Sequence, residues 1–564
     1  MKSFKPKFVL KQNNSQVLRL TPLGGVGDVT KNMYVYEFGD DILIVDCGVG
    51  FPDDAMPGVD LVIPDITYLR DKVQKIRGIL ITHGHDDHIG GLPYIWPELQ
   101  APVYTQRLTA GFIKAKFTEH NLPKNKINEV NINDTLNLGA FNVSFYQVAH
   151  SIPDSTGIVI KTPVGTIIHQ ADFKIDWTPP SGQLTDVGKV ARLGGEGVHL
   201  LLIDCLRVEK PGFNPSEASI EDSFEKAALE TSGKLLITTT SSNISRLQQA
   251  INVAQKLGRK VAVAGRSFEN NIQVARDLGY LDIPPGIMIA ADAIDSFAPS
   301  KVMILIAGAQ GQQGSSLSRA ANEEHKQIKL KEGDSVVFSA DPIPSTESAQ
   351  SALIDDLTSL GVDVYYSAIH SNLHVSGHAA LEELRIMVNL IKPKFMLPIG
   401  GTFKHMKEFS RQFQKNGYRK EQILDVIDGD TMEITRDNIK LNGRVEVKNV
   451  FVDGLGVGDV GNVVLRDRQL MSEEGIVVVV VKIDQHTSRL EGEPEVISRG
   501  FVFEEINRDL MEEAKEVIKG ILARHERKIA DWRFVRKMIE NDLEKFLYQT
   551  TERRPLILPL VVEV

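Results

Sequence analysis

The chain has 564 residues, more than one hydrophobic core normally supports, so we expect about two to four domains. Hydrophobic residues make up 42% and charged residues 24%, as in a soluble globular protein. The net charge of −10 excludes a uniformly basic nucleic-acid binder, although not a nuclease that meets phosphates with metals and a few basic groups.

Neither a membrane span nor a secretory signal is predicted. The longest apolar run, at 475–483, has the length of a strand and falls short of the about 20 residues that a membrane-spanning helix requires. Residues 1–16 are basic and polar without an apolar core or cleavage site, so we expect a cytoplasmic protein. Cys47 and Cys205 lie in separate apolar runs, which predicts buried thiols.

The pattern of predicted helices and strands changes along the chain. Residues 17–170 alternate β-branched runs with turns, which predicts a largely antiparallel or mixed sheet sandwich. From about residue 216, long helical patterns alternate with short apolar strands such as KLLITTT and KVMILIAG, which is typical of an α/β unit with a mostly parallel sheet. Residues 378–445 return to a helix beginning at His378, a buried strand, a second helix and a pair of strands.

An insertion explains this order most simply. We therefore expect an α/β protein whose body is formed by 1–215 and 378–447, interrupted by an inserted domain at 216–377. A glycine-rich linker at 448–462 would lead into a C-terminal α+β domain at 463–564, with strands followed by charged helices at 507–526 and 530–548.

The linker contains Gly456-x-Gly458-x-x-Gly461, which formally matches a dinucleotide fingerprint. The following VVLRDRQL is interpreted as a strand, whereas such a site needs a helix. We therefore interpret these glycines as tight turns.

The strongest chemical signal follows the apolar run GILI. The loop after this run contains four potential metal ligands within six residues: His83, His85, Asp87 and His88. Ordinary surface or core roles rarely place so many such residues so close together, so these roles explain the loop poorly. His150 and Asp172 also lie at the ends of apolar strands, and beside this cluster they are interpreted as further ligands. The pattern predicts a metal site and metal-assisted hydrolysis.

The arrangement HxHxDH, with a histidine and an aspartate further on, resembles the metallo-β-lactamase superfamily. The resemblance implies an αββα sandwich with two Zn²⁺ sites. His83, His85 and His150 would hold one ion, Asp87 and His88 the other, and Asp172 would bridge them, while Asp87 would also serve catalysis. Asp46 matches a supporting aspartate, and His169 is open between a role beside the metals and a structural one.

The inserted unit resembles the β-CASP domain of nucleic-acid nucleases. The resemblance makes Asp204 and His378 catalytic, helping to protonate the leaving 3′-oxygen. Phosphate-binding residues would come from loops after strands and before helices, where backbone N–H groups attract anions. They are Ser242, Asn243, Arg266, Ser267, His374, Ser376, Gly377 and His378, although each loop alone is also explained as a turn or cap.

Along almost its whole length the chain is similar to the ribonuclease J family, through motifs such as THGHDDHIGGLPY, DPIPSTE, HVSGH and GLGVGDVGNVVLRDRQLMSEEG. The resemblance implies 5′-to-3′ exonucleolysis of single-stranded RNA with a preference for 5′-monophosphate ends, plus endonuclease activity, in mRNA decay and ribosomal RNA maturation. It also implies homodimers or homotetramers assembled with help from the tail, and an RNA-degradation complex as a partner.

One position departs from that family, because Gly400 stands where the pattern has a histidine that binds the second metal. The second site would then be weaker, or occupied by Mn²⁺ or Mg²⁺, with water, substrate phosphate or His405 completing the shell. The alternatives are a catalytically weakened RNA-binding partner subunit and a DNA-repair nuclease. An active ribonuclease is favoured because all other motif positions are retained.

Overall fold

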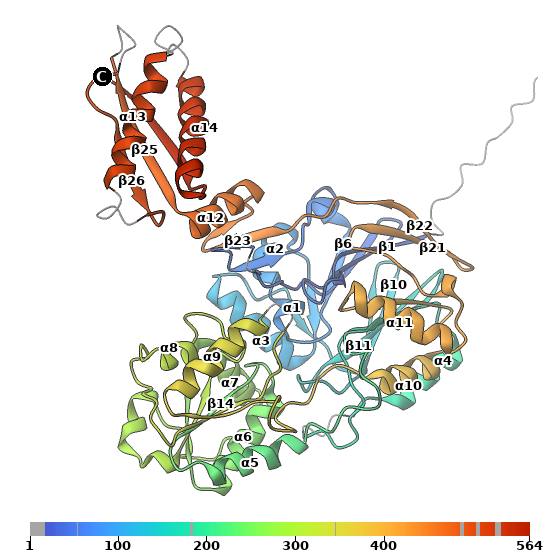
Figure 1. Ribbon diagram of the computed structural model, residues 1–564. Helices are drawn as coiled ribbons and strands as arrows, with labels where there is room; N and C mark the ends of the chain where they lie inside the picture. The colour runs from blue at the N-terminus through green and yellow to red at the C-terminus, as the bar shows by residue number, and fades with distance from the viewer. Residues whose placement is uncertain are drawn as a thin grey trace, which may run out of the picture. The chain divides into compact units, whose positions relative to one another are not determined.

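The structure is a computed structural model that describes residues 17–53, 55–180, 184–343, 346–484, 490–502, 508–524 and 532–564. The N-terminal segment interpreted above as lacking a secretory signal lies outside these residues. The chain divides into two compact units, one formed by residues up to Gly50 with Val62–Val450, and the other by Phe51–Leu61 with Phe451–Val564. The first unit contains both the body and the inserted domain (Figure 1).

Two sheets form the body. The first has the order β22-β21-β1-β3-β4-β6-β7-β8. Its strands are β1 (Leu18–Gly24), β3 (Met33–Phe38), β4 (Asp41–Val45), β6 (Ile76–Leu80), β7 (Val103–Thr105), β8 (Ile127–Glu129), β21 (Asp430–Ile434) and β22 (Ile439–Arg444). The chain therefore returns after the insertion to complete this sheet, because β21 pairs with β1.

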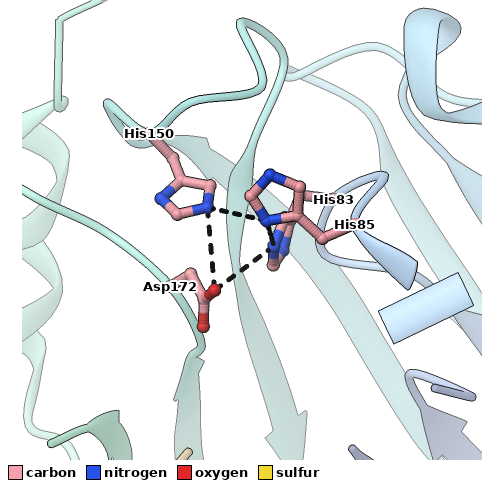
Figure 2. A group of neighbouring side chains, drawn as sticks. All are labelled: His83, His85, His150 and Asp172. Atoms are coloured by element: carbon pink, nitrogen blue, oxygen red, sulfur yellow. Dashed lines mark hydrogen bonds and ion pairs between the residues drawn. The ribbon is translucent and has the colours of Figure 1, made fainter. Parts of the chain in front are cut away.

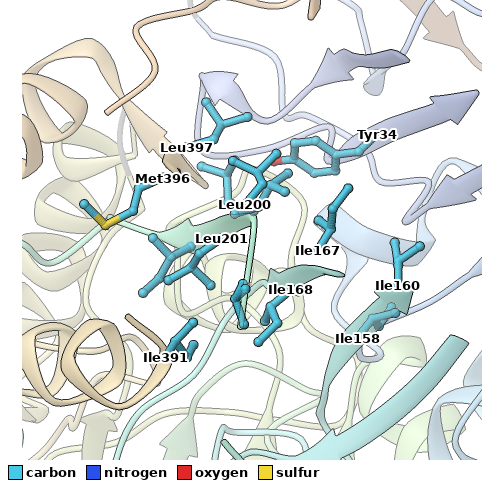
Figure 3. Close-up of a cluster of buried hydrophobic side chains, with 14 of the residues drawn as sticks. Tyr34, Ile158, Ile160, Ile167, Ile168, Leu200, Leu201, Ile391, Met396 and Leu397 are labelled. Atoms are coloured by element: carbon cyan, nitrogen blue, oxygen red, sulfur yellow. The ribbon is translucent and has the colours of Figure 1, made fainter. Parts of the chain in front are cut away.

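The second sheet has the order β19-β13-β12-β11-β10-β9. Its strands are β9 (Thr135–Leu138), β10 (Phe141–Gln147), β11 (Thr156–Thr162), β12 (Gly165–Gln170), β13 (Leu200–Asp204) and β19 (Phe395–Ile399). Aliphatic and aromatic side chains of both sheets form one buried cluster (Figure 3), which includes Tyr34, Ile158 and Leu200. Burial of this apolar surface is the main force that holds the two sheets together.

Helices complete the body: α1 (Asp86–Ile89), α2 (Leu92–Leu99), α3 (Arg107–Glu119), α4 (Val187–Glu196), α10 (Leu381–Ile391) and α11 (Phe403–Lys415). Short strands β2 (Val26–Gly27) and β20 (Gly401–Thr402) pair with each other, and a 3-10 helix spans Thr67–Lys75. The expected sandwich of two sheets between helices is confirmed.

The inserted domain has a five-stranded sheet in the order β15-β16-β14-β17-β18, and each pairing is parallel. The strands are β14 (Leu235–Thr238), β15 (Lys260–Ala264), β16 (Val302–Ile306), β17 (Ser335–Phe338) and β18 (Asp363–Tyr365). The helices are α5 (Ser219–Glu230), α6 (Ile244–Lys256), α7 (Arg266–Asp277), α8 (Ser316–Ala321) and α9 (Glu347–Ser359). The predicted parallel α/β unit is confirmed.

The second unit is built on β25 (Ile476–Ile483), which pairs antiparallel with β26 (Glu495–Arg499) and parallel with β27 (Leu556–Glu563). Helices α13 (Arg508–Arg524) and α14 (Trp532–Thr551) pack on it through a separate apolar cluster. The two charged helices predicted here are present, although residues 507, 525–526 and 530–531 lie outside the described residues.

Two sequence-based interpretations are wrong. The segment VVLRDRQL is part of helix α12 (Asn462–Glu474), not a strand, because its β-branched pair occupies only the first turn and good helix formers follow between Gly461 and Gly475. The helix expected from His378 begins at Leu381, because the Glu383 carboxylate accepts a hydrogen bond from the Ala380 N–H and fixes the helix start there.

The predicted linker also contains short strands, β23 (Val450–Asp453) and β24 (Gly456–Val457), which pair with each other. β5 (Leu61–Ile63) lies next to β23 in the same small sheet. Within the described residues, no helix has both the length and the apolar character needed to cross a bilayer.

Candidate metal centre

Strand ends of both sheets bring the predicted ligands together. β6 ends just before the loop that carries His83 and His85, β10 leads to His150, and β12 leads to Asp172. Figure 2 shows the three imidazoles and the Asp172 carboxylate pointing toward one another. The separated sequence positions therefore converge, as the motif predicted.

The first group consists of His83, His85, His150 and Asp172, whose ligand atoms all lie within 4.8 Å of one another. His85 Nδ1 lies 3.1 Å from both His83 Nε2 and His150 Nε2. Asp172 Oδ2 lies 3.4 Å from His83 Nε2 and 3.6 Å from His150 Nε2. Three nitrogens and one carboxylate oxygen form the donor set that zinc prefers, so the residues fit a divalent cation.

Each imidazole of this group is oriented through its other nitrogen. His83 Nδ1 is 3.0 Å from Thr82 Oγ1, and His85 Nε2 is 2.7 Å from Ser151 Oγ. His150 Nδ1 donates to the carbonyl oxygen of Gly377 at 2.8 Å, which leaves the Nε2 lone pair directed into the group.

Burial favours the neutral form of His85 and His150, which is the form that binds metals. Burial and the neighbouring His83 lower the pKa of His85 to about 3. Burial and the adjacent His83 and His85 also lower the pKa of His150 well below its usual value. These two imidazoles are therefore disposed to bind a cation rather than a proton.

The second group consists of Asp87, His88 and Asp172. His88 Nε2 lies 3.5 Å from Asp87 Oδ2 and 3.6 Å from Asp172 Oδ1, while His88 Nδ1 is held at 2.8 Å by Asp46 Oδ2. Asp46 also accepts hydrogen bonds from the N–H and hydroxyl of Thr82. Asp46 is thus hydrogen-bonded to one residue of the second group and to the Thr82 that orients His83.

A third group joins Asp172 to Asp204 and His378. His378 Nδ1 lies 2.8 Å from Asp204 Oδ2, and its Nε2 lies 3.7 Å from Asp172 Oδ2. Burial alone would lower the pKa of His378, but the two carboxylates outweigh it and raise the pKa to about 9. Asp172 is therefore common to all three groups.

Gly400 follows β19 with φ of +63°, near Asp204. A Cβ at this position would lie 3.6 Å from Asp204 Oδ1. His405 is directed elsewhere: its Nδ1 accepts from the Thr402 N–H at 3.2 Å, and its Nε2 lies 3.5 Å from Glu209. In the part of the chain that the structure describes, His405 belongs to none of the ligand groups.

Most of the residues expected to bind phosphate fall into three environments. Ser376, Gly377 and His378 lie beside the metal groups, where the Ser376 hydroxyl accepts from the His378 N–H. The Asn243 side chain caps α6 by accepting from the Arg246 N–H, and Ser242 is buried next to it. Arg266 and Ser267 begin α7 and are exposed.

His374 and His169 lie outside the three ligand groups and contact other residues. His374 Nδ1 lies 3.1 Å from Arg246 Nη1. His169 is fully buried and its Nδ1 is 2.9 Å from the hydroxyl of Tyr36, outside the three ligand groups. The supporting roles of Thr82 and Ser151 were not anticipated, because one hydroxyl beside a motif carries no distinguishing sequence signal.

Comparison with known proteins agrees with the geometry of a metal-dependent hydrolase. Four family profiles match: the metallo-beta-lactamase superfamily over residues 26–224, the ribonuclease J beta-CASP domain over 232–357, the Zn-dependent metallo-hydrolase RNA specificity domain over 361–423 and the ribonuclease J C-terminal domain over 463–564. Fold and site together define a metallo-β-lactamase-type nuclease with an inserted β-CASP domain.

Relatives that match over almost the full length show which nuclease family the chain belongs to. Ribonuclease J2 of Bacillus subtilis (strain 168) is 38% identical over 558 residues, covering 98% of this chain and 100% of the relative. Ribonuclease J 2 of Staphylococcus aureus (strain MRSA252) is 36% identical, with 99% and 100% covered. The chain therefore belongs to the ribonuclease J family.

A solved structure described as a protein of unknown function from Enterococcus faecalis V583 shares the fold, with a TM-score of 0.53 and 16% identity. The match covers 74% of this chain and 100% of that one.

Proposed function

We propose that this protein is a zinc-dependent ribonuclease that degrades single-stranded RNA from the 5′ end, favours 5′-monophosphate ends and also cuts internally. The observation that carries the proposal is the convergence of His83, His85, His150 and Asp172 within 4.8 Å. Its roles would be in mRNA decay and ribosomal RNA maturation, as the family resemblance implies, and the sequence-based expectation of a cytoplasmic location fits these roles.

Different residues of the chain would bind the cations and protonate the leaving group. His83, His85, His150 and Asp172 would hold the first cation, and Asp87, His88 and Asp172 the second. Bound divalent cations would lower the pKa of a water molecule and neutralise charge on the phosphoryl oxygens. His378, whose Nδ1 lies 2.8 Å from Asp204 Oδ2, would together with Asp204 help to protonate the leaving 3′-oxygen, and the nearby carboxylates raise the pKa of His378 to about 9, which favours its protonated form.

Substrate would pass between the body and the inserted domain. The 5′-phosphate would be held by Ser376, Gly377 and the loops that carry Ser242 and Ser267. This assignment is supported by the position of Gly377, whose carbonyl contacts the metal-group residue His150. Exposed Arg266 at the start of α7 would add a positive charge on this path.

Gly400 makes the second cation site weaker, because glycine supplies no side-chain ligand. Two carboxylates and one imidazole remain, a set richer in oxygen that suits Mn²⁺ or Mg²⁺ as well as zinc. The protein would therefore respond to added Mn²⁺ more than an enzyme with a complete second site.

Assembly into homodimers or homotetramers would use the second unit, and a larger RNA-degradation complex is a further expected partner. Burial alternates along β25, and several side chains of the neighbouring strands β26 and β27 are exposed. The exposed apolar residues there include Ile497, Leu558, Leu560 and Val562, each at least 41% exposed. An apolar sheet face of this kind is suited to burial against another subunit.

Turnover of a 5′-monophosphorylated RNA oligomer tests the proposal. Wild type should degrade it with added Zn²⁺ or Mn²⁺, a DNA oligomer of the same sequence should compete poorly, and His83→Ala should be inactive. Cleavage by His83→Ala at the wild-type rate would overturn the assignment. Tight RNA binding without cleavage under any metal condition would instead indicate a non-catalytic partner subunit.

A further inference from the structure

Arg246 is a buried arginine of the inserted domain, only 2% exposed. Its guanidinium forms two hydrogen bonds with the carboxylate of Glu217, at 2.8 and 2.9 Å. The remaining N–H groups reach the carbonyl oxygens of Ser339 and Val375 and the Nδ1 of His374. All five donors of the guanidinium are thus engaged, so Arg246 has none left for a substrate phosphate.

The loop that Arg246 holds touches the first metal group. His374 and Val375 belong to the same short loop as Gly377, whose carbonyl oxygen accepts from His150 Nδ1 at 2.8 Å. The approach is close, because a Cβ added to Gly377 would lie 2.7 Å from His150 Cε1. A shift of this loop would therefore rotate or displace the imidazole of His150.

Glu217, the carboxylate partner of Arg246, contacts the segment of the body that follows Asp172. The Glu217 N–H donates to Asp176 Oδ2 at 2.8 Å, and Asp176 forms an ion pair with Lys174 at 3.1 Å. Lys174 and Asp176 lie on the same segment shortly after Asp172, and the Lys174 N–H donates to the Ala149 carbonyl beside His150. The Arg246–Glu217 pair therefore contacts both the loop whose Gly377 carbonyl accepts from His150 and the segment that follows Asp172.

We propose that Arg246 is a positioning residue that makes the cation affinity of the body depend on the inserted domain. It acts through Val375 and Gly377 on His150, and through Glu217 and Asp176 on the segment after Asp172. This inference rests on the proposed function, because it takes the group around His150 to be a cation site. Groups that orient metal-binding imidazoles typically change metal affinity about 10- to 100-fold when altered.

Metal titration of the full-length protein tests the idea without relying on catalysis. Zn²⁺ binding to metal-stripped wild type and Arg246→Lys is measured by calorimetry. Lysine keeps the positive charge, but it lacks the planar guanidinium that donates to both Glu217 oxygens and to the Val375 carbonyl at once. We expect Zn²⁺ affinity at the first site to fall about tenfold or more.

Arg259 provides a matched control. It is also buried in the inserted domain, at 5% exposed, and its guanidinium donates only to the backbone carbonyls of Ala228, Thr231, Gly233 and Val302. Arg259→Lys should disturb the inserted domain as Arg246→Lys does, while leaving Zn²⁺ affinity within about twofold of wild type.

The outcomes separate cleanly. Equal losses of affinity in the two variants, or an unchanged affinity in Arg246→Lys, would overturn the inference. Should Arg246→Lys fail to fold, Glu217→Gln decides: we expect its Zn²⁺ affinity to fall several-fold, and a wild-type affinity contradicts the proposal. Absence of Zn²⁺ binding by the wild type would instead reject the proposed function itself.

Discussion

The first and second ligand groups, which both contain Asp172, differ in the number of ligands that they supply. The first has three imidazoles and a carboxylate, and each imidazole is fixed through its second nitrogen. Within the described residues, the second has Asp87 and His88 besides Asp172, and Gly400 stands where the family resemblance would place a histidine. Under the proposed function, this difference predicts a preorganised first cation site and a second site that depends on ligands from solvent or substrate.

Removal of the shared carboxylate should have the largest effect. Asp172→Ala deletes a ligand of both groups, so we expect loss of both cations and a fall in RNA cleavage of about 10³-fold or more, since metal stabilisation of transition-state charge is worth several kcal/mol. Asp87→Ala is the matched variant and should retain one cation per chain. Elemental analysis and single-turnover cleavage measure both effects; two retained cations in Asp172→Ala would show that it is no bridge.

Asp46 supports His88 through a hydrogen bond of 2.8 Å. Its φ of +62° is tolerated by asparagine, so Asp46→Asn changes charge with little backbone strain. We expect the affinity of the second site for Mn²⁺ to fall about 10- to 100-fold, and that of the first site to fall less. Competition with a metal-binding dye gives both constants. An equal loss at the two sites would remove the distinction between them.

Gly400→His tests the gap directly. Room exists for a Cβ, but the positive φ would cost a histidine about 1 kcal/mol. We expect the second site to bind Mn²⁺ about tenfold more tightly while the thermal midpoint falls by a few degrees. Gly400→Ala carries the same backbone cost without a ligand, and improved Mn²⁺ binding in that variant would show that position 400 is not the missing ligand.

Asp428 and Asp172 are buried carboxyl groups whose pKa values are shifted in opposite directions. A change at Asp428 is expected to have the smallest effect. Burial alone would raise the pKa of Asp172, but His378 and His88 hold that pKa well below its usual value. Burial raises the pKa of Asp428 to about 7, and within the described residues its carboxylate accepts a hydrogen bond from the Val26 N–H.

Because the folded-state pKa of Asp428 exceeds its unfolded value, its contribution to stability is largest below about pH 4 and is lost as the pH rises through 7. Asp428→Asn keeps an acceptor for Val26 and should raise the thermal midpoint at pH 8 but not at pH 4. Thermal melts at the two pH values measure this, and an equal change at both would contradict it.

Much of the site could be predicted from sequence because its ligands form a dense local motif or end apolar strands. His150 and Asp172 were recognised in this way, and both lie in the group with His83. The roles of Thr82, Ser151 and Arg246 could not be, because their importance comes from partners brought near by folding, such as Gly377 and Glu217.

The fold was predictable in class and less so in element type and bounds. The parallel strands of the inserted domain are long apolar runs between helices, and they were assigned correctly. Helix α12 was missed because its β-branched start resembles a strand and only Leu465 is buried, so the helix has little amphipathic pattern. The start of α10 was misplaced because it depends on the side chain of Glu383.

The most direct test of the central claim is a crystal structure of the protein with Zn²⁺, with anomalous scattering recorded at the zinc edge. We predict a strong peak about 2.0–2.2 Å from His83 Nε2, His85 Nδ1, His150 Nε2 and an Asp172 oxygen, and a weaker peak beside Asp87 and His88. Absence of zinc from the first position, in crystals that bind it elsewhere, would contradict the account.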